Sequence, residues 1–78
     1  MVRPTRVTND IRRLRFAHGE MTQAELAERV GVTRQTIIAI EQGRYSPSLE
    51  MAFQIASAFS VPLDDVFQYP ATTKENAR

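Results

Sequence analysis

Residues 22–43, TQAELAERVGVTRQTIIAIEQG, decide the fold of this 78-residue chain. The stretch begins with the pattern of a short helix. Thr22 can cap that helix, because its hydroxyl accepts a hydrogen bond from a free N–H of the first turn. Glu25 stands three residues later and can reach back to complete a capping box. Gly31 ends the helix, since glycine adopts a positive φ at little cost.

A second short helix follows this glycine turn. Thr33 can cap it and Gly43 ends it. Val32, just before the cap, can pack on Ile37 inside the helix as a hydrophobic staple. Small Ala27 near the turn lets the two helices cross closely at a steep angle. Two capped helices in this arrangement predict a helix-turn-helix.

The same stretch resembles the helix-turn-helix domain of Cro and the phage repressors, and of the many small bacterial regulators of this XRE type. The resemblance continues through YSPSLEMAFQIASAF and SVPLDDVF and covers roughly residues 9–67. It implies an all-α, lambda-repressor-like fold of five helices. It also makes Arg15 the expected partner of Glu41, since such a pair often ties the first and third helices together in the family. The segment 18–21 is one residue longer than the usual connection between the first two helices.

The length of the chain is that of a single domain. We expect an ordered core over about residues 9–69, a basic N-terminal arm over 1–8 and a polar C-terminal tail over 70–78. The arm is either a plain disordered terminus or a segment that lies along phosphate or enters a minor groove. No stretch alternates as a strand does, so all regular structure is expected to be helical. Besides the two helices above, we expect helices over about residues 9–18, 49–59 and 61–67, with Thr8 or Asn9 capping the first.

The composition favours a reducing compartment and a polyanionic partner. The chain has no cysteine, no export leader and no long apolar run, so we expect it in the cytoplasm and not in a membrane. Residues 1–44 hold eight arginines against five acidic residues, whereas residues 45–78 hold two basic against four acidic residues. The positive half is the half with the helix-turn-helix, which suits DNA. Ordinary scatter of surface charge would produce a similar difference.

No group of residues predicts catalysis. An enzyme needs a nucleophile beside a base, paired carboxylates in a pocket, or a metal ion. Asp64 and Asp65 are adjacent on a short helix and point to different sides, and the serines fit caps and turns. With His18 as the single histidine and no cysteine, there is no metal-binding pattern. We therefore expect no enzymatic activity, no cofactor and no small-molecule ligand.

The outward face of the second helix predicts contacts with DNA bases. A recognition helix places its N-terminal residues against base edges in the major groove. Arg34 can bind guanine and Gln35 adenine, while Ile38 and Ala39 fit the methyl groups of thymine. The matching positions of the resembling repressors lie near bases. The alternative is a solvated helix edge, which leaves an exposed isoleucine without a reason.

Phosphate contacts are expected beside this face. Gln23 opens a helix whose N-terminal amides favour an anion. Thr33 and Thr36 carry hydroxyls near the expected groove wall. Arg44 and Tyr45 follow the recognition helix and match positions that meet the DNA backbone in the resembling family. Tyr45 is equally suited to packing against the protein.

These patterns predict a sequence-specific DNA-binding transcriptional regulator, and specifically a repressor. One small recognition unit supplies little contact, so we expect a homodimer on a pseudo-palindromic site in double-stranded DNA. Surplus apolar surface on the fourth helix and around Val66, Phe67 and Tyr69 is the expected dimer interface. The alternative function is a protein-interaction or antitoxin-like module that uses the same fold without reading bases.

Overall fold

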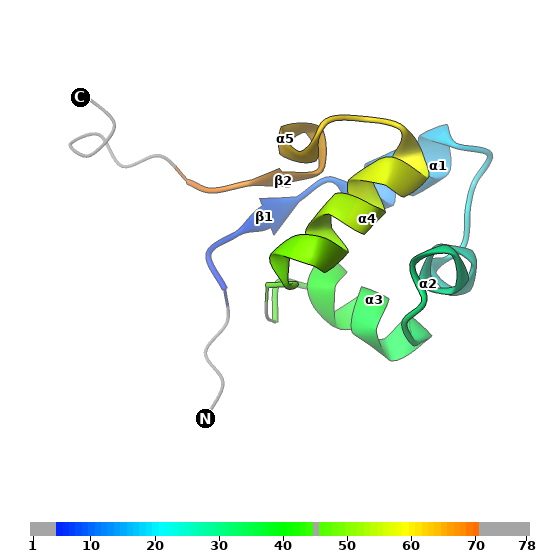
Figure 1. Ribbon diagram of the computed structural model, residues 1–78, viewed down its shortest axis with the longest axis horizontal. Coiled ribbons are helices and arrows are strands. Elements are labelled where there is room, and N and C mark those ends of the chain that lie inside the picture. Colours follow the sequence, from blue (N-terminus) through cyan, green and yellow to red (C-terminus); the bar gives the residue numbers. More distant parts are fainter. Residues whose placement is uncertain (1–4, 45, 71–78) are drawn as a thin grey trace.

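The computed structural model describes residues 5–44 and 46–70. This part of the chain forms five helices, which confirms the predicted five-helix, all-α architecture. It also forms one pair of short strands. In Figure 1, α4 crosses the middle of the molecule, with α5 and the strands above it and α2 and α3 below. The elements in chain order are β1 (Thr8–Asn9), α1 (Ile11–Ala17), α2 (Gln23–Val30), α3 (Arg34–Glu41), α4 (Leu49–Phe59), α5 (Leu63–Val66) and β2 (Phe67–Gln68).

Helix α2 has the predicted caps at both ends. The hydroxyl of Thr22 accepts a hydrogen bond from the N–H of Glu25 at 3.0 Å, and the Glu25 carboxylate accepts one from the N–H of Thr22 at 2.8 Å. At the other end Gly31 has φ of 84°. This conformation lets the carbonyl of Ala27 accept from the N–H groups of both Gly31 and Val32, at 2.8 and 3.0 Å. The chain therefore leaves α2 in a defined direction.

Helix α3 is bounded in the same way. Its first turn is capped by Thr33, whose hydroxyl accepts from the N–H of Thr36 at 3.2 Å. Its end is a Schellman motif in which Gly43, with φ of 72°, donates to the carbonyl of Ile40. Arg44 donates to the carbonyl of Ala39 at 3.0 Å. These hydrogen bonds satisfy terminal carbonyls that would otherwise lack partners.

One buried cluster takes side chains from every helix. Each large aliphatic or aromatic side chain in it contributes roughly 1.5–3 kcal/mol through removal from water. Ile40 on α3 is among the most deeply buried, with 2% of its surface exposed. The residues of the cluster are Ile11, Leu14, Met21, Leu26, Ala27, Val30, Ile37, Ile40, Ile55, Ala56, Phe59 and Val66.

Among the described residues, no helix is both long enough and apolar enough to cross a membrane.

The start of α1 differs from the sequence prediction. Neither Thr8 nor Asn9 occupies the N-cap position; the helix begins at Ile11 after Asp10, which makes no side-chain capping bond. The side-chain oxygen of Asn9 accepts from the N–H of Ile11 at 3.1 Å, and its amide nitrogen donates to the carbonyl of Ile40 at 3.0 Å. Asn9 thus connects the start of α1 to α3. The chain before Ile11 is extended because it pairs with the C-terminal strand.

The prediction that all regular structure is helical is wrong at this strand pair. Strands β1 and β2 pair antiparallel, with Thr8 opposite Gln68 and Asn9 opposite Phe67. The fifth helix correspondingly ends at Val66, and Phe67 has the extended angles φ of −122° and ψ of 138°. Two residues per strand are too few to produce an alternating pattern in the sequence.

The longer connection between α1 and α2 turns twice in the left-handed region. Gly19 and Glu20 have φ of 79° and 56°. His18, directly before them, has one ring nitrogen 2.9 Å from the carbonyl oxygen of Leu14 and the other 3.0 Å from that of Phe59. The imidazole therefore lies between the C-terminal ends of α1 and α4. The extra residue is accommodated without disturbing the cap of α2.

Candidate nucleic-acid interface

Helix α3 presents the predicted base-reading residues on its outer face. Arg34 and Gln35 are exposed, and Ile38 and Ala39 are partly exposed. Two buried isoleucines on the opposite face fix the rotation of the helix about its axis. The four residues are therefore presented together on a rigid, capped element. Their assignment as base contacts remains a prediction.

The residues predicted to bind phosphate lie around α3 in different environments. Gln23 is partly buried, and its amide nitrogen donates to a carboxylate oxygen of Glu41 at 3.2 Å. The hydroxyl oxygens of Thr33 and Thr36 are 3.0 Å apart, so they bond to each other. Arg44 is exposed after the end of α3. Tyr45, the remaining predicted contact, lies outside the described residues.

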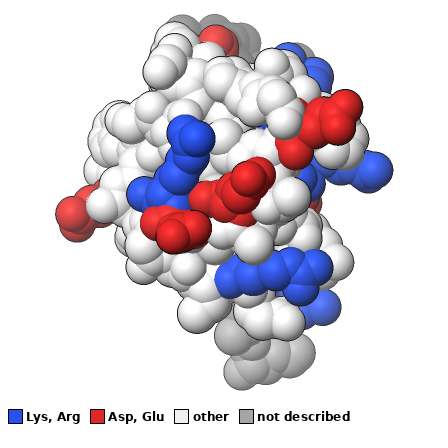
Figure 2. Space-filling model, turned by 90° about the vertical axis from the view of Figure 1, so that its right-hand side faces the viewer, with Lys and Arg blue, Asp and Glu red and all other residues white. Residues whose placement is uncertain are grey.

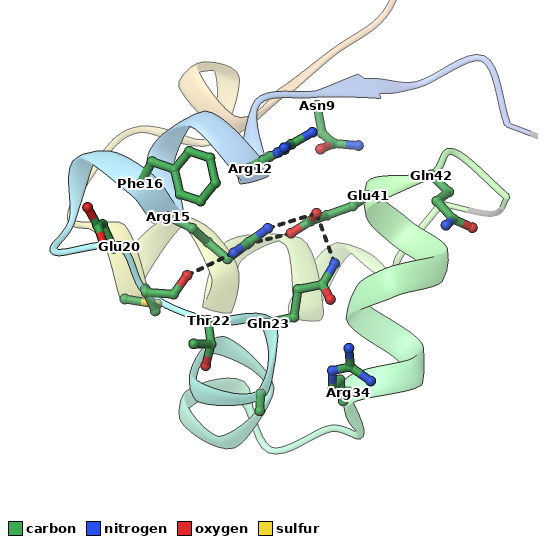
Figure 3. Close-up of a pocket in the computed structure, with 12 residues that line it drawn as sticks. Asn9, Arg12, Arg15, Phe16, Glu20, Thr22, Gln23, Arg34, Glu41 and Gln42 are labelled. Carbon is green, nitrogen blue, oxygen red and sulfur yellow. Dashed lines mark hydrogen bonds and ion pairs between the residues drawn. The ribbon is translucent and has the colours of Figure 1, made fainter.

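A buried ion pair joins the first and third helices, as the family resemblance implies. The carboxylate of Glu41 accepts from Nε of Arg15 at 2.7 Å and from Nη2 at 3.2 Å. The side chains of Arg15 and Glu41 are only 8% and 9% exposed. The remaining guanidinium nitrogen of Arg15 donates to the carbonyl of Met21 at 2.8 Å. The pair therefore holds α1, the connection to α2 and α3 in one arrangement (Figure 3).

An open pocket of about 750 Å³ lies between α1, the start of α2 and α3. Arg34 and Gln23, both singled out in the sequence, line it together with Arg12 and Phe16 of α1. Arg12 is a candidate that sequence reasoning missed, because its position on α1 gave no indication that its side chain lies beside the recognition helix. The pairing of Arg15 with Glu41 was the available signal, since it brings this part of α1 next to α3.

Charges on the molecular surface are interspersed. On the face shown in Figure 2, cationic and anionic side chains lie next to each other and neither sign covers a broad area. Asp10 neutralises Arg13 at 3.4 Å on α1. Within the described parts of the chain, Arg12, Arg34 and Arg44 form no ion pair. The excess positive charge of the N-terminal half is therefore carried by a few unpaired arginines.

The expected dimer interface needs one correction. Val66 is fully buried in the core cluster, so it offers no surface to a partner. Its neighbour Phe67 is partly buried against the same cluster. By contrast, Leu49 and Phe53 on α4 are 67% and 52% exposed, and Tyr69 is 62% exposed. The apolar surface available for association therefore centres on α4.

The described residues offer no metal-binding cluster of histidine, cysteine, aspartate or glutamate side chains. The five-helix arrangement, with a glycine turn between the two capped helices α2 and α3, defines a helix-turn-helix domain. What distinguishes such domains from one another is the set of side chains on the outer face of α3. In this chain that face carries the exposed Arg34 and Gln35 and the partly exposed Ile38 and Ala39.

Comparison with known proteins assigns the family. A helix-turn-helix family model matches residues 11–66 of the chain. An uncharacterized HTH-type transcriptional regulator of Methanocaldococcus jannaschii is 51% identical over 61 residues, which cover 78% of this chain and 91% of the relative. The uncharacterized HTH-type transcriptional regulator YgzD of Bacillus subtilis is 51% identical over 59 residues, which cover 76% of this chain and 88% of the relative.

A solved structure agrees with these sequence matches. The restriction-modification controller protein C.AhdI from Aeromonas hydrophila superimposes with a TM-score of 0.65 at 29% sequence identity, covering 70% of this chain and 78% of that one. The chain belongs to the helix-turn-helix family of transcriptional regulators. This family is one of DNA-binding proteins and not of enzymes, in agreement with the prediction from the sequence.

Proposed function

We propose that this protein is a sequence-specific repressor that binds a pseudo-palindromic operator as a homodimer and acts in the cytoplasm. The observation that carries the proposal is the outer face of α3, where two exposed polar side chains, Arg34 and Gln35, stand beside the partly exposed Ile38 and Ala39. A solvated helix edge gives no reason for apolar residues there. Contact with thymine in a major groove gives such a reason, because the thymine methyl group is exposed there.

In this proposal Arg34 and Gln35 read the bases. Both belong to the first turn of α3, which is the part of a recognition helix that lies deepest in the major groove. Arg34 has no carboxylate partner among the described residues, so its guanidinium is available to a guanine. A well-placed bidentate contact of this kind discriminates against the wrong base by roughly 1–3 kcal/mol.

Phosphate contacts on both sides of α3 orient the domain on the duplex. Arg44 contributes a full charge from beyond the end of the helix. Gln23 gives one amide hydrogen to Glu41 and has a second for a phosphate oxygen. The hydroxyls of Thr33 and Thr36 bond to each other and exchange that bond for phosphate when DNA is present. Tyr45 completes the proposed set as the residue after Arg44.

The proposed dimer places two copies of α3 in successive major grooves, with half-site centres ~10 bp apart. Leu49 and Phe53 are the proposed contacts between the copies, because they are the large apolar side chains that α4 exposes. Light scattering at micromolar protein concentration, with and without operator, measures the stoichiometry. A one-to-one complex with a complete site would refute the dimer.

Selection of bound sites from random duplex DNA tests the function as a whole. An enriched inverted repeat is the expected result. Failure to enrich any sequence would favour a protein-interaction or antitoxin-like module instead. With a selected site, Arg34→Ala should lower affinity by about 1–3 kcal/mol and relax preference at one base pair.

Phosphate contacts should behave differently in the same titrations. Arg44→Ala should weaken binding to all sequences and reduce the salt slope by about one unit, because one counterion-releasing contact is lost. Gln23→Ala should weaken binding at an unchanged slope, because a neutral amide releases no counterion. An equal loss on every single-base variant for Arg34→Ala would make Arg34 another phosphate contact.

A further inference from the structure

The three arginines of α1 differ in their ion pairs and contacts. Arg13 pairs with Asp10 at 3.4 Å, and Arg15 is buried against Glu41. Arg12 is exposed and forms no ion pair within the part of the chain that the structure describes. Its guanidinium carbon lies 5.5 Å from the centre of the Phe16 ring, within the range of a cation–π contact. Arg12 is therefore an uncompensated charge with a preferred position.

Phe16 itself is unusual for its place in the fold. It is a large aromatic residue on a short core-packed helix, yet about half of its surface is exposed. Its ring also lies 5.6 Å from the guanidinium carbon of the buried Arg15. One ring thus contacts two guanidinium groups, one buried and one exposed. This contact favours positions of the Arg12 guanidinium beside the Phe16 ring, and both side chains line the pocket.

The pocket brings Arg12 next to the base-reading helix. Arg12 lines it from α1 and Arg34 lines it from α3, with Gln23 of α2 between them (Figure 3). Glu41 also faces the pocket, but Arg15 neutralises it. Glu20 is the remaining carboxylate, on the connection between α1 and α2. The pocket therefore carries a net positive charge contributed by two arginines from different helices.

We propose that this pocket receives a backbone phosphate of the DNA and that Arg12 is its charged ligand. This inference rests on the proposed DNA-binding function and extends the contact surface from α2 and α3 to α1. Phe16 acts as a positioning residue that keeps the guanidinium over the pocket, so that less side-chain freedom is lost on binding. Arg12 contributes affinity without base preference, since phosphate carries no sequence information directly.

The test uses Arg12→Ala with Arg13→Ala as the matched control. The two residues are exposed neighbours on α1, and they differ in that Arg13 is already paired with Asp10. Both variants and the unmodified chain are titrated with the selected duplex and with a scrambled duplex at 50 and 200 mM salt. For Arg12→Ala we expect weaker binding to both duplexes and a salt slope smaller by about 0.9, so that the affinity deficit shrinks about 3–4-fold between the two salt concentrations. Arg13→Ala should change the affinity for either duplex by no more than about twofold and should leave the salt slope unchanged.

Two further variants separate charge from packing. Arg12→Lys keeps the charge and should retain the salt slope of the unmodified chain. Phe16→Leu keeps apolar bulk without the ring. It should leave the melting temperature unchanged and weaken binding by less than Arg12→Ala does. An unchanged slope for Arg12→Ala, or an equal effect of Arg13→Ala, would overturn the inference while leaving the proposed function in place. If the unmodified chain binds neither duplex, the proposed function fails, and the inference fails with it.

Discussion

The Arg15–Glu41 pair should behave as a buried ion pair whose partners depend on each other. Two hydrogen bonds join the two side chains, and each side chain is more than nine-tenths buried. Removing one partner leaves the other charge in the core, which typically costs about 3–5 kcal/mol. A domain of this length is stable by roughly 4–12 kcal/mol, so either single change removes a large fraction of its stability.

A double-mutant cycle measures this dependence. Arg15→Met and Glu41→Leu remove each charge and retain apolar bulk, and the double variant replaces the pair with two apolar side chains. We expect each single variant to lose about 3–5 kcal/mol in urea-induced unfolding and the double variant to lose less than the sum by about 2 kcal/mol or more. The control cycle is Arg13 with Asp10, whose exposed side chains should couple by only ~0.2–1 kcal/mol.

Additivity would refute this reasoning. If the free energy of unfolding lost by the double variant equals the sum of the two single losses, the two charges are not energetically coupled. The link between α1 and α3 then lies elsewhere. The hydrogen bond from Arg15 to the carbonyl of Met21 would then be the main contribution of this arginine. That bond would be lost in Arg15→Met and unaffected in Glu41→Leu.

Three other changes test the fold and the assembly. Ile40→Ala should destabilise the domain by roughly 2–5 kcal/mol in a thermal melt, because its side chain is 2% exposed; a shift of only a degree or two would contradict its place in the core. Gly43→Ala should cost about 1–2 kcal/mol through its φ of 72° alone, since an added Cβ has no atom within 4 Å; an unchanged unfolding midpoint would show that the turn adapts. Phe53→Ser should lower the dimer fraction in light scattering without lowering the melting temperature of the monomer, and an unaltered dimer would place the interface elsewhere.

Local patterns made the helix-turn-helix predictable from the sequence. The caps at Thr22 and Thr33 and the turn at Gly31 depend on residues at most a few positions apart, and the structure has all of them. The Arg15–Glu41 pair spans 26 residues and followed from the family resemblance, not from any local rule.

The elements that the sequence did not predict depend on contacts between distant residues. Asn9 and Phe67 pair in the short sheet, and nothing near either residue indicates the other. The same pairing moved the start of α1 to Ile11, because Asp10 donates its N–H to the carbonyl of Val66 at 2.9 Å. The sequence places Val66 in the expected dimer interface, and only the packing of α5 shows that it belongs to the core.

The hydrogen bond between Gln23 and Glu41 connects the stability of the domain to its proposed contact with DNA. Glu41 accepts from Arg15 and from Gln23, so the ion pair that holds α1 to α3 also orients the first residue of α2. A primary amide has two hydrogens, and the one not given to Glu41 remains for a phosphate oxygen. A donor that is already oriented loses less conformational freedom when it binds. If Gln23 binds phosphate as proposed, the carboxylate has a structural role in the core and a positioning role at the surface. These two roles would then give a reason for a charged pair at a place where an apolar pair would stabilise the core as well.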